Sequence, residues 1–332
     1  MKLRNVALPA LPLFARALAL LALGIVPALS TAQGFPTKPV RMIVPVSAGG
    51  LKDVLIRGVG QELSKLWGQP VVVENRLGAA HIIATEHVVK SAPDGHTLLA
   101  TDKPWTTNPF LYAKLPYDGV NDLVPVVNLA QVTEILVANR DLPANNLREL
   151  LAYARARPGE LNYGSFGKGS VPHIDTESLA TTTGIRITHI PYKGIADVVP
   201  ALVSGQIQIA FGGVPPVLPL IRQGRLKAIA YGGAQRSPML PDVPTFAEAG
   251  LPGFEAWSWS GLLAPAATPR PVIEKIAADV GRVLAMPDIR AKYYDNVGME
   301  MLYLGPDKFA ELLRADRAQF GALVKTLGMK PE

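Results

Sequence analysis

The feature that most constrains the fold of this chain is an alternation of short apolar runs with longer amphipathic stretches. Apolar runs at residues 40–45, 71–74 and 97–100 are separated by segments with helical periodicity. The segment from Asp53 carries Leu55, Val59, Leu63 and Leu66 on one helical face. Strands that alternate with helices in this way are typical of parallel α/β architecture.

A second series of the same kind follows after residue 134. Strands are expected at residues 135–138, 161–163, 188–190, 207–211 and 228–231. A Pro- and Gly-rich stretch from Pro238 to Gly253 precedes two amphipathic helices, expected at 271–285 and 306–327. Because 332 residues exceed an average domain, we expect two α/β lobes with a ligand between them, where strand ends meet helix N-termini.

The N-terminal 32 residues have the layout of a secretory signal peptide. Lys2 and Arg4 provide a basic start, residues 17–26 form an apolar run, and Ser30 and Ala32 are the small residues of a cleavage site. A membrane span needs about 20 apolar residues, so the run is too short for one. We therefore expect export to the periplasm, with cleavage near Ala32.

Composition excludes several function classes. Without cysteine, the chain has no disulfide framework, no thiolate metal site and no cysteine nucleophile. The net charge of +6 falls when Lys2, Arg4 and Arg16 are removed with the signal peptide, which leaves 30 basic and 27 acidic residues. With so small an excess and no clustered basic stripe, nucleic acid is not an expected partner.

Two glycine- and serine-containing loops, at residues 47–53 and 164–170, each lie between an expected strand and an expected helix. Glycine lets backbone N–H groups approach an anion closely, and a helix N-terminus adds about half a positive charge. These loops indicate a ligand site with one loop in each lobe. The alternative is ordinary turn chemistry, with Asp53 and Ser170 as helix N-caps.

Enzymatic motifs are missing from the second loop and from the rest of the sequence. Lys168 is followed by Gly169 rather than Ser or Thr, so the loop is not a nucleotide P-loop. The sequence contains no G-x-S-x-G and no H-E-x-x-H. We expect no metal and no cofactor, and we interpret His173 and His189 as hydrogen-bonded structural groups. Trp257 and Trp259 suit either a cleft wall or strand packing.

An ordered series of short segments resembles a known family over residues 35–328. The segments are residues 36–45, Gly49-Gly50 with Asp53 and Arg57, 68–76, 93–99, 108–109, 115–118, 163–165, Gly167, 169–170 with His173, 191–194, 240–245, 264–265 and 268–269. In this order they resemble the tripartite tricarboxylate transporter substrate-binding proteins, also called the Bug receptors.

The resemblance implies a two-lobed periplasmic binding protein of Venus-flytrap, type II-like architecture with crossing hinge strands. After the signal peptide (1–32), lobe 1 would comprise residues 33–133 and 254–332, and lobe 2 residues 134–253. It implies a monomeric, non-enzymatic receptor that delivers a small organic carboxylate to a membrane transporter with one large and one small integral membrane subunit. A receptor that presents its ligand to a sensor kinase and, more remotely, a secreted hydrolase are the alternatives.

The resemblance also implies which residues contact the ligand. By position these lie in the two loops, with a contribution from the loop between Thr101 and Asn108. The candidates are Ser47, Ala48, Gly49, Gly50, Asp53, Thr101, Asn108, Ser165, Gly167, Gly169, Ser170 and His173. Lys52 and Trp105 join them as residues at which this chain departs from the family pattern.

The chain departs from the family pattern at four places. Lys52 replaces a small hydroxyl residue, residues 78–83 replace a glycine-rich stretch, Gly212-Gly213 stands where an Asp commonly follows a strand, and the loop 102–105 is bulkier and more charged. With Lys52, Lys103 and Lys168 around the cleft, we hypothesise an acid with more than one carboxylate, or an aromatic acid that stacks on Trp105. The alternative is that these lysines face solvent.

Overall fold

The computed structural model describes residues 34–46, 48–295, 298–328 and 331. The predicted signal peptide and its cleavage site lie outside the described residues, and so does Ser47. The chain divides into two units, residues 1–35 and 36–332. All of the structure discussed below belongs to the second unit.

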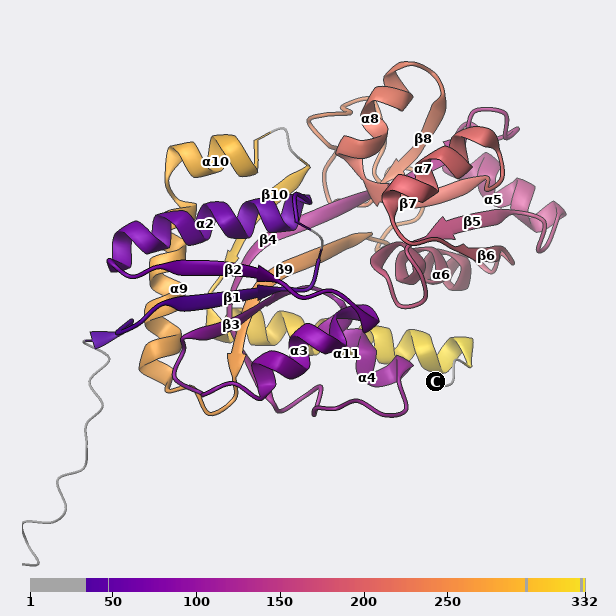
Figure 1. The fold of residues 1–332 in the computed structure, drawn as a ribbon. Helices are drawn as coiled ribbons and strands as arrows, with labels where there is room; N and C mark the ends of the chain where they lie inside the picture. Colours follow the sequence, from indigo (N-terminus) through magenta and orange to yellow (C-terminus); the bar gives the residue numbers. More distant parts are fainter. Residues whose placement is uncertain (1–33, 47, 296–297, 329–330, 332) are drawn as a thin grey trace, which may run out of the picture. The chain divides into compact units, whose positions relative to one another are not determined.

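The second unit is an α/β structure (Figure 1). Its strands are β1 (Val40–Val44), β2 (Val71–Asn75), β3 (Thr97–Thr101), β4 (Leu123–Asn139), β5 (Asn162–Ser165), β6 (Thr188–Pro191), β7 (Ile209–Gly213), β8 (Leu226–Tyr231), β9 (Trp257–Pro265) and β10 (Met299–Leu304). Its helices are α2 (Leu51–Trp67), η2 (Ala79–His81), α3 (Ile82–Val89), α4 (Pro104–Leu111), α5 (Leu147–Ala156), α6 (Val171–Thr183), α7 (Ile195–Ser204), α8 (Val214–Arg222), α9 (Arg270–Leu284), α10 (Pro287–Tyr293) and α11 (Pro306–Leu327).

The strands follow the order β2-β1-β3-β9-β4-β7-β5-β6, and β8 and β10 also pair with β4. The outer pairs β1–β2, β1–β3, β5–β6 and β5–β7 are parallel, as the alternating sequence pattern predicts. The pairs that β4 and β9 make are antiparallel. The sheet is therefore mixed, with antiparallel strands at its centre.

Strand β4 exchanges partners in its middle. Up to Thr133 it pairs with β9, where Thr133 lies opposite Trp257; from Glu134 it pairs with β7, where Glu134 lies opposite Gly213. We call β2, β1, β3, β9, β10 and residues 123–133 the first half-sheet, and β5, β6, β7, β8 and residues 134–139 the second. The sequence predicts only residues 135–138 as a strand, because proline and polar side chains interrupt the apolar pattern before them.

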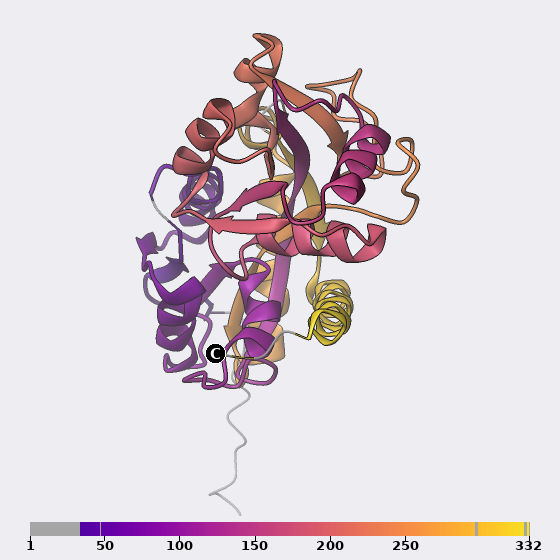
Figure 2. The same cartoon turned by 90° about the vertical axis from the view of Figure 1, so that its right-hand side faces the viewer.

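Each half-sheet has its own apolar core. In the first, Ile43 and Leu99 pack with Trp259 and Phe309. In the second, successive residues of β4 face opposite sides, so Leu136 packs in one cluster and Ile135 in another, and helices cover both faces. Helix α11, seen end-on in Figure 2, contacts both α4 and α6 and links the halves.

Some local predictions are wrong in detail. Helix α2 begins at Leu51 after Gly50 rather than at Asp53, and Leu66, predicted on the buried face, is 44% exposed. Helices α4 and α8 were not predicted because prolines at their starts and in their interiors obscure the pattern.

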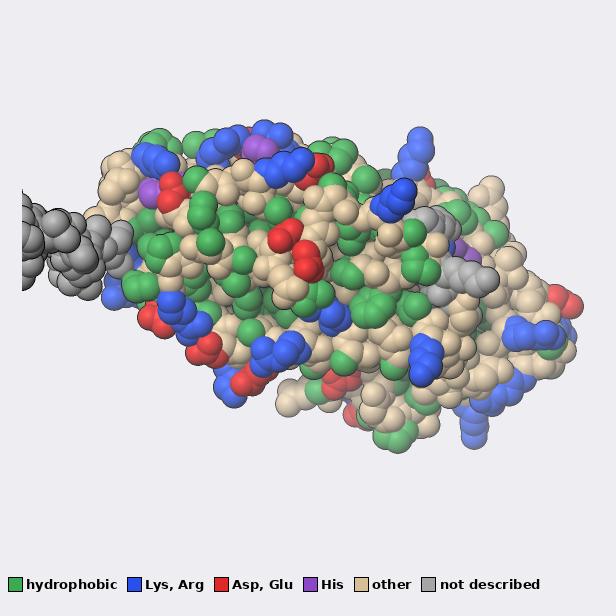
Figure 3. Space-filling view, turned by 90° about the horizontal axis from the view of Figure 1, so that it is seen from below, with side chains coloured by type: hydrophobic (Ala, Val, Ile, Leu, Met, Phe, Trp, Pro, Cys, Tyr) green, Lys and Arg blue, Asp and Glu red, His purple; other side chains and the backbone are tan. Residues whose placement is uncertain are grey.

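Within the described ranges, none of the helices combines the length and apolar character that crossing a bilayer requires. On the face that Figure 3 shows, Lys and Arg side chains are scattered among apolar and acidic ones rather than gathered into a stripe.

Gly261 on β9 offers a test of the packing of the first half-sheet. A Cβ atom there would lie 2.4 Å from the Phe309 ring and 2.8 Å from the backbone oxygen of Val127. Overpacking of this kind costs about 1–3 kcal/mol, so Gly261→Ala should lower the free energy of unfolding in urea by that amount. Gly305→Ala, with open space around its Cβ position, is the control, and equal losses in both variants would contradict this packing.

Candidate functional site

A cavity of about 610 Å³ lies between the two half-sheets and draws its walls from both. The first half-sheet side contributes Lys52, His81 and Asp102, and the second contributes residues 168–172 with Lys193. Glu134 of β4 lies between them. A more open hollow of about 760 Å³ lies beside α2 and β2. Its described lining residues all fall between 57 and 73, so it belongs to the first half-sheet side alone.

Four helices begin at this cavity. The lining residues include Lys52 at the start of α2, Pro104 at the start of α4, Pro172 at the start of α6 and Gly194, the N-cap residue of α7. Each helix follows the carboxyl end of a parallel strand, which is where α/β proteins bind ligands. The dipoles of these helices together favour an anion. At the start of α4, however, Pro104 has no N–H, and the N–H groups of Trp105 and Thr106 donate to the Asp102 and Lys103 carbonyls.

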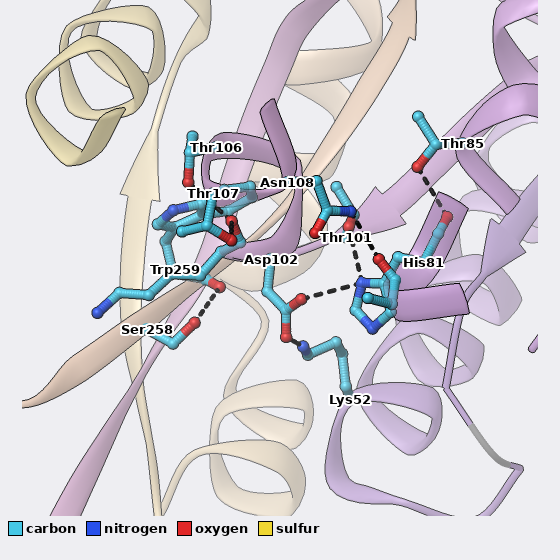
Figure 4. Close-up of polar contacts among 12 residues, drawn as sticks. Lys52, His81, Thr85, Thr101, Asp102, Thr106, Thr107, Asn108, Ser258 and Trp259 are labelled. Atoms are coloured by element: carbon cyan, nitrogen blue, oxygen red, sulfur yellow. Dashed lines mark hydrogen bonds and ion pairs between the residues drawn. The ribbon is translucent and has the colours of Figure 1, made fainter. Parts of the chain in front are cut away.

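The charged side chains of the wall add to that preference. Among the described lining residues, Lys52, Lys168 and Lys193 carry ammonium groups, against the acidic side chains of Asp102 and Glu134. Lys52 contacts the Asp102 carboxylate (Figure 4). Burial lowers the pKa of Lys52, while this contact stabilises its charged form.

The three lysines that the sequence places around the cleft, Lys52, Lys103 and Lys168, lie in different environments. The side chains of Lys52 and Lys103 are 15% and 13% exposed, so neither projects into solvent. Lys103 pairs with Asp175 at 3.3 Å and lines a second cavity, of about 450 Å³, rather than the first. Lys168 is exposed but lines the first cavity.

The second loop is held from behind by two histidines. Ser165 Oγ lies 2.6 Å from His189 Nε2, and the Gly169 N–H donates to His173 Nδ1 over 3.3 Å. Burial, with the nearby His189 and Lys168, lowers the pKa of His173 to about 4, so it stays neutral and can accept this bond. Gly167 and Gly169 have φ angles of +100° and +80°, which glycine adopts without strain. These contacts fix the backbone that faces the cavity.

The predicted site residues fall into two groups. Lys52, Gly169 and Ser170 line the cavity. The others are not among its lining residues: Ala48, Gly49 and Gly50 are exposed in the first loop, Gly167 is half-buried, and the buried ones are Asp53, Thr101, Trp105, Asn108, Ser165 and His173. Contact with a ligand stays a prediction for all of them.

Asp53 and Trp105 have roles in the fold that their sequence patterns did not reveal. The Asp53 carboxylate accepts hydrogen bonds from Arg57, from the Gly49 N–H and from Asn75; burial favours its neutral form, but these bonds lower its pKa. Trp105 is 3% exposed and stacks on Tyr117, so its ring offers no face for the hypothesised stacking. Trp259 is also in the core, whereas Trp257 lines the second cavity.

Four ionisable lining residues were not among the predicted site residues: His81, Asp102, Glu134 and Lys193. His81 and Asp102 lie in two stretches, residues 78–83 and 102–105, that depart from the family pattern, and this departure is the sequence feature that could have identified them. Glu134 precedes an expected strand and carried no signal. The described residues contain no group of three or more His, Asp or Glu placed to hold a metal ion.

A buried acid pair lies beside the cavity. Glu134 and Asp175 are 5% and 3% exposed. Burial raises the pKa of Asp175 to about 6, with Lys103 opposing and Asp316 adding to the shift. Burial, and then the charge of Asp175, raises the pKa of Glu134 well above its usual range. Burial alone would lower the pKa of Lys103, but Asp175, Asp316 and Glu134 raise it. The Glu134–Asp175 pair therefore keeps a proton near neutral pH.

This acid pair predicts a pH-dependent stability difference. Acids whose pKa is raised by folding stabilise the protein below about pH 4, the pKa of the unfolded chain, and lose that contribution as pH rises through the folded values. Glu134→Gln keeps the shape of the neutral acid, so its free energy of unfolding should rise relative to that of wild type as the pH increases above about 4. Urea unfolding at several pH values, with exposed Glu311→Gln as control, measures this; parallel profiles for Glu134→Gln and wild type would contradict it.

The comparisons with known proteins agree with this arrangement. The family model described as "Tripartite tricarboxylate transporter family receptor" matches residues 55–329. The solved structure of an R. palustris protein with adipate is 34% identical, with a TM-score of 0.79, and the match covers 90% of this chain and 100% of that one. MatC from Rhodopseudomonas palustris, solved with bound malate, is 33% identical, with a TM-score of 0.76 and coverages of 87% and 100%.

A third solved structure, of the periplasmic binding protein BugD, is 30% identical, with a TM-score of 0.77. That match covers 90% of this chain and 100% of BugD. The predicted α/β fold of a periplasmic binding protein is thereby confirmed.

Proposed function

Because this chain belongs to the family of tripartite tricarboxylate transporter receptors, we propose that it is an exported, non-catalytic solute receptor that binds a small organic carboxylate in the 610 Å³ cavity. The observation that carries the proposal is the convergence of four helix N-termini and three lysines on that cavity. Such a site compensates negative charge without a metal or cofactor.

The ligand class follows from the positions of the lysines. Lys52 lies on the wall from the first half-sheet, and Lys168 and Lys193 lie on the wall from the second. An acid with at least two carboxylates could meet both walls at once. The adipate and malate bound by the two R. palustris proteins support the same class.

We further propose that the half-sheets correspond to two lobes, residues 33–133 with 254–332 and residues 134–253. Strand β4 changes partners between Thr133 and Glu134, so a hinge there would let the lobes close on a ligand that bridges them. The closed, monomeric receptor would deliver its acid in the periplasm to a transporter with one large and one small membrane subunit.

A ligand screen tests the proposed function. Thermal shift and calorimetry over mono-, di- and tricarboxylates, aromatic acids, and neutral and cationic solutes should find stabilisation by di- or tricarboxylates, without turnover of the ligand. A ligand at 100 times its Kd raises stability by about 2.7 kcal/mol, which such screens detect. Binding confined to neutral or cationic solutes would refute the proposal.

Lys193 tests the role of cavity charge. Because its side chain is exposed at the cavity wall, its pairing with a ligand carboxylate is worth about 0.2–1 kcal/mol. Lys193→Met should therefore weaken dicarboxylate binding roughly two- to five-fold. The control is Lys90→Met, at an exposed lysine that pairs with Glu86 outside the cavity; the same loss in both variants would argue against a local effect.

A further inference from the structure

Lys52, His81 and Asp102, which come from three separate segments, meet in the cavity wall (Figure 4). We call them the Asp102 cluster. Lys52 contacts one carboxylate oxygen of Asp102, Oδ2. The other, Oδ1, lies 3.2 Å from His81 Nδ1, but the hydrogen bond of that nitrogen runs to Thr101 Oγ1, at 3.3 Å. Asp102 is 8% exposed, and in the described chain its Oδ1 has no hydrogen-bond partner.

A buried acceptor of this kind requires an explanation, because nearly all buried polar atoms in folded proteins are hydrogen-bonded. Asp102 Oδ1 belongs to a residue that lines the cavity. A donor on a ligand in the cavity would complete its hydrogen bonding and remove the cost of leaving it unmade.

His81 contributes a second acceptor. Burial, and then the charge of Lys52, lowers the pKa of His81 to about 3, so the imidazole is neutral at pH 7 and has one donor and one acceptor nitrogen. We assign its proton to Nδ1, where it donates to Thr101 Oγ1, because the Asp102 carboxylate 3.2 Å away favours a hydrogen over a lone pair on that nitrogen. Nε2 is then an acceptor.

The backbone that presents His81 is strained. Ala79, Ala80 and His81 have φ angles of +46°, +46° and +73°, a region that residues other than glycine rarely adopt. The segment is held there by two bonds: Asn108 Nδ2 donates to the Ala80 oxygen over 2.8 Å, and Thr85 Oγ1 donates to the His81 oxygen over 2.9 Å. Strain that is anchored in this way is typical of ligand sites, and here it fixes the ring beside Asp102.

We propose that the Asp102 cluster is the subsite for a hydroxyl group of the ligand, so that the receptor selects hydroxycarboxylic acids over acids that lack the hydroxyl. This inference rests on the proposed carboxylate function. A carboxylate placed directly against Asp102 Oδ1 or His81 Nε2 would be repelled, so we expect the carboxylates of the ligand at the lysines and the helix N-termini rather than at these two acceptors. A ligand ammonium group would meet the charge of Lys52, which already contacts the same Asp102 carboxylate, so a neutral donor fits best.

Matched pairs of acids test the inference. Calorimetry on the purified protein compares both enantiomers of malate with succinate, and citrate with tricarballylate, which differ only by a hydroxyl group. The hydroxylated member should bind roughly ten- to hundred-fold more tightly in each pair that binds, since a hydrogen bond to a charged group has that worth.

Two variants assign the preference to the Asp102 cluster. The double variant Lys52→Met/Asp102→Leu removes both charges, which avoids a lone buried ion, and His81→Asn keeps a residue type that tolerates positive φ. Each should reduce the preference for the hydroxylated acid to about three-fold or less. The ratio of the two affinities within a pair is the readout, because loss of Lys52 weakens the binding of both acids.

The controls carry the same changes outside the cavity. Lys38→Met/Asp94→Leu removes an exposed ion pair with a 2.8 Å contact, and His87→Asn changes a half-buried histidine of α3; both should keep the wild-type preference. Equal affinities within each pair would overturn the inference and leave the carboxylate function standing. A preference that survives in both cluster variants would overturn the assignment to this cluster, and a protein that binds none of the acids would refute the proposed function as well.

Discussion

Strand β4 pairs with β9 up to Thr133 and with β7 from Glu134, and the rest of the site takes its position from this change of partner. The parallel strands of both half-sheets are placed outward from β4 and β9. The loops after β1, β3, β5 and β6 lead into helices that begin at one cavity. A single continuous backbone thus sets the spacing between the two walls of the cavity, and it is where we propose that they hinge.

The same strand brings charge into the interior. Glu134 lies beside Asp175 and, through it, near Lys103, which belongs to the loop before α4. Buried ion pairs contribute little net stability, because desolvation offsets their attraction. Of these three residues, Glu134 lines the cavity between the half-sheets, and Lys103 and Asp175 line the second cavity, so the cluster connects the two cavities. It links the proposed hinge to both walls and makes their packing sensitive to protonation.

Much of this arrangement could be predicted from the sequence, for identifiable reasons. Strands β1, β2 and β3 are short, largely apolar runs flanked by turn residues, so they stand out. The glycines at 167 and 169 mark a backbone that L-residues adopt with difficulty. What could not be predicted depends on tertiary pairing. Thr133 and Glu134 occupy a strand only because β9 and β7 provide partners, and Asp102 meets Lys52 and His81 only once three separate segments are folded.

The central claim is that a carboxylate binds where α2, α4, α6 and α7 begin. A crystal structure of the protein grown with a dicarboxylate that stabilises it in solution tests this most directly. The account predicts density for the acid in the cavity lined by Lys52, Ser170 and Lys193, with its carboxylates at the helix N-termini. An acid bound instead in the hollow beside Arg57, or in the second cavity beside Lys103, would contradict it.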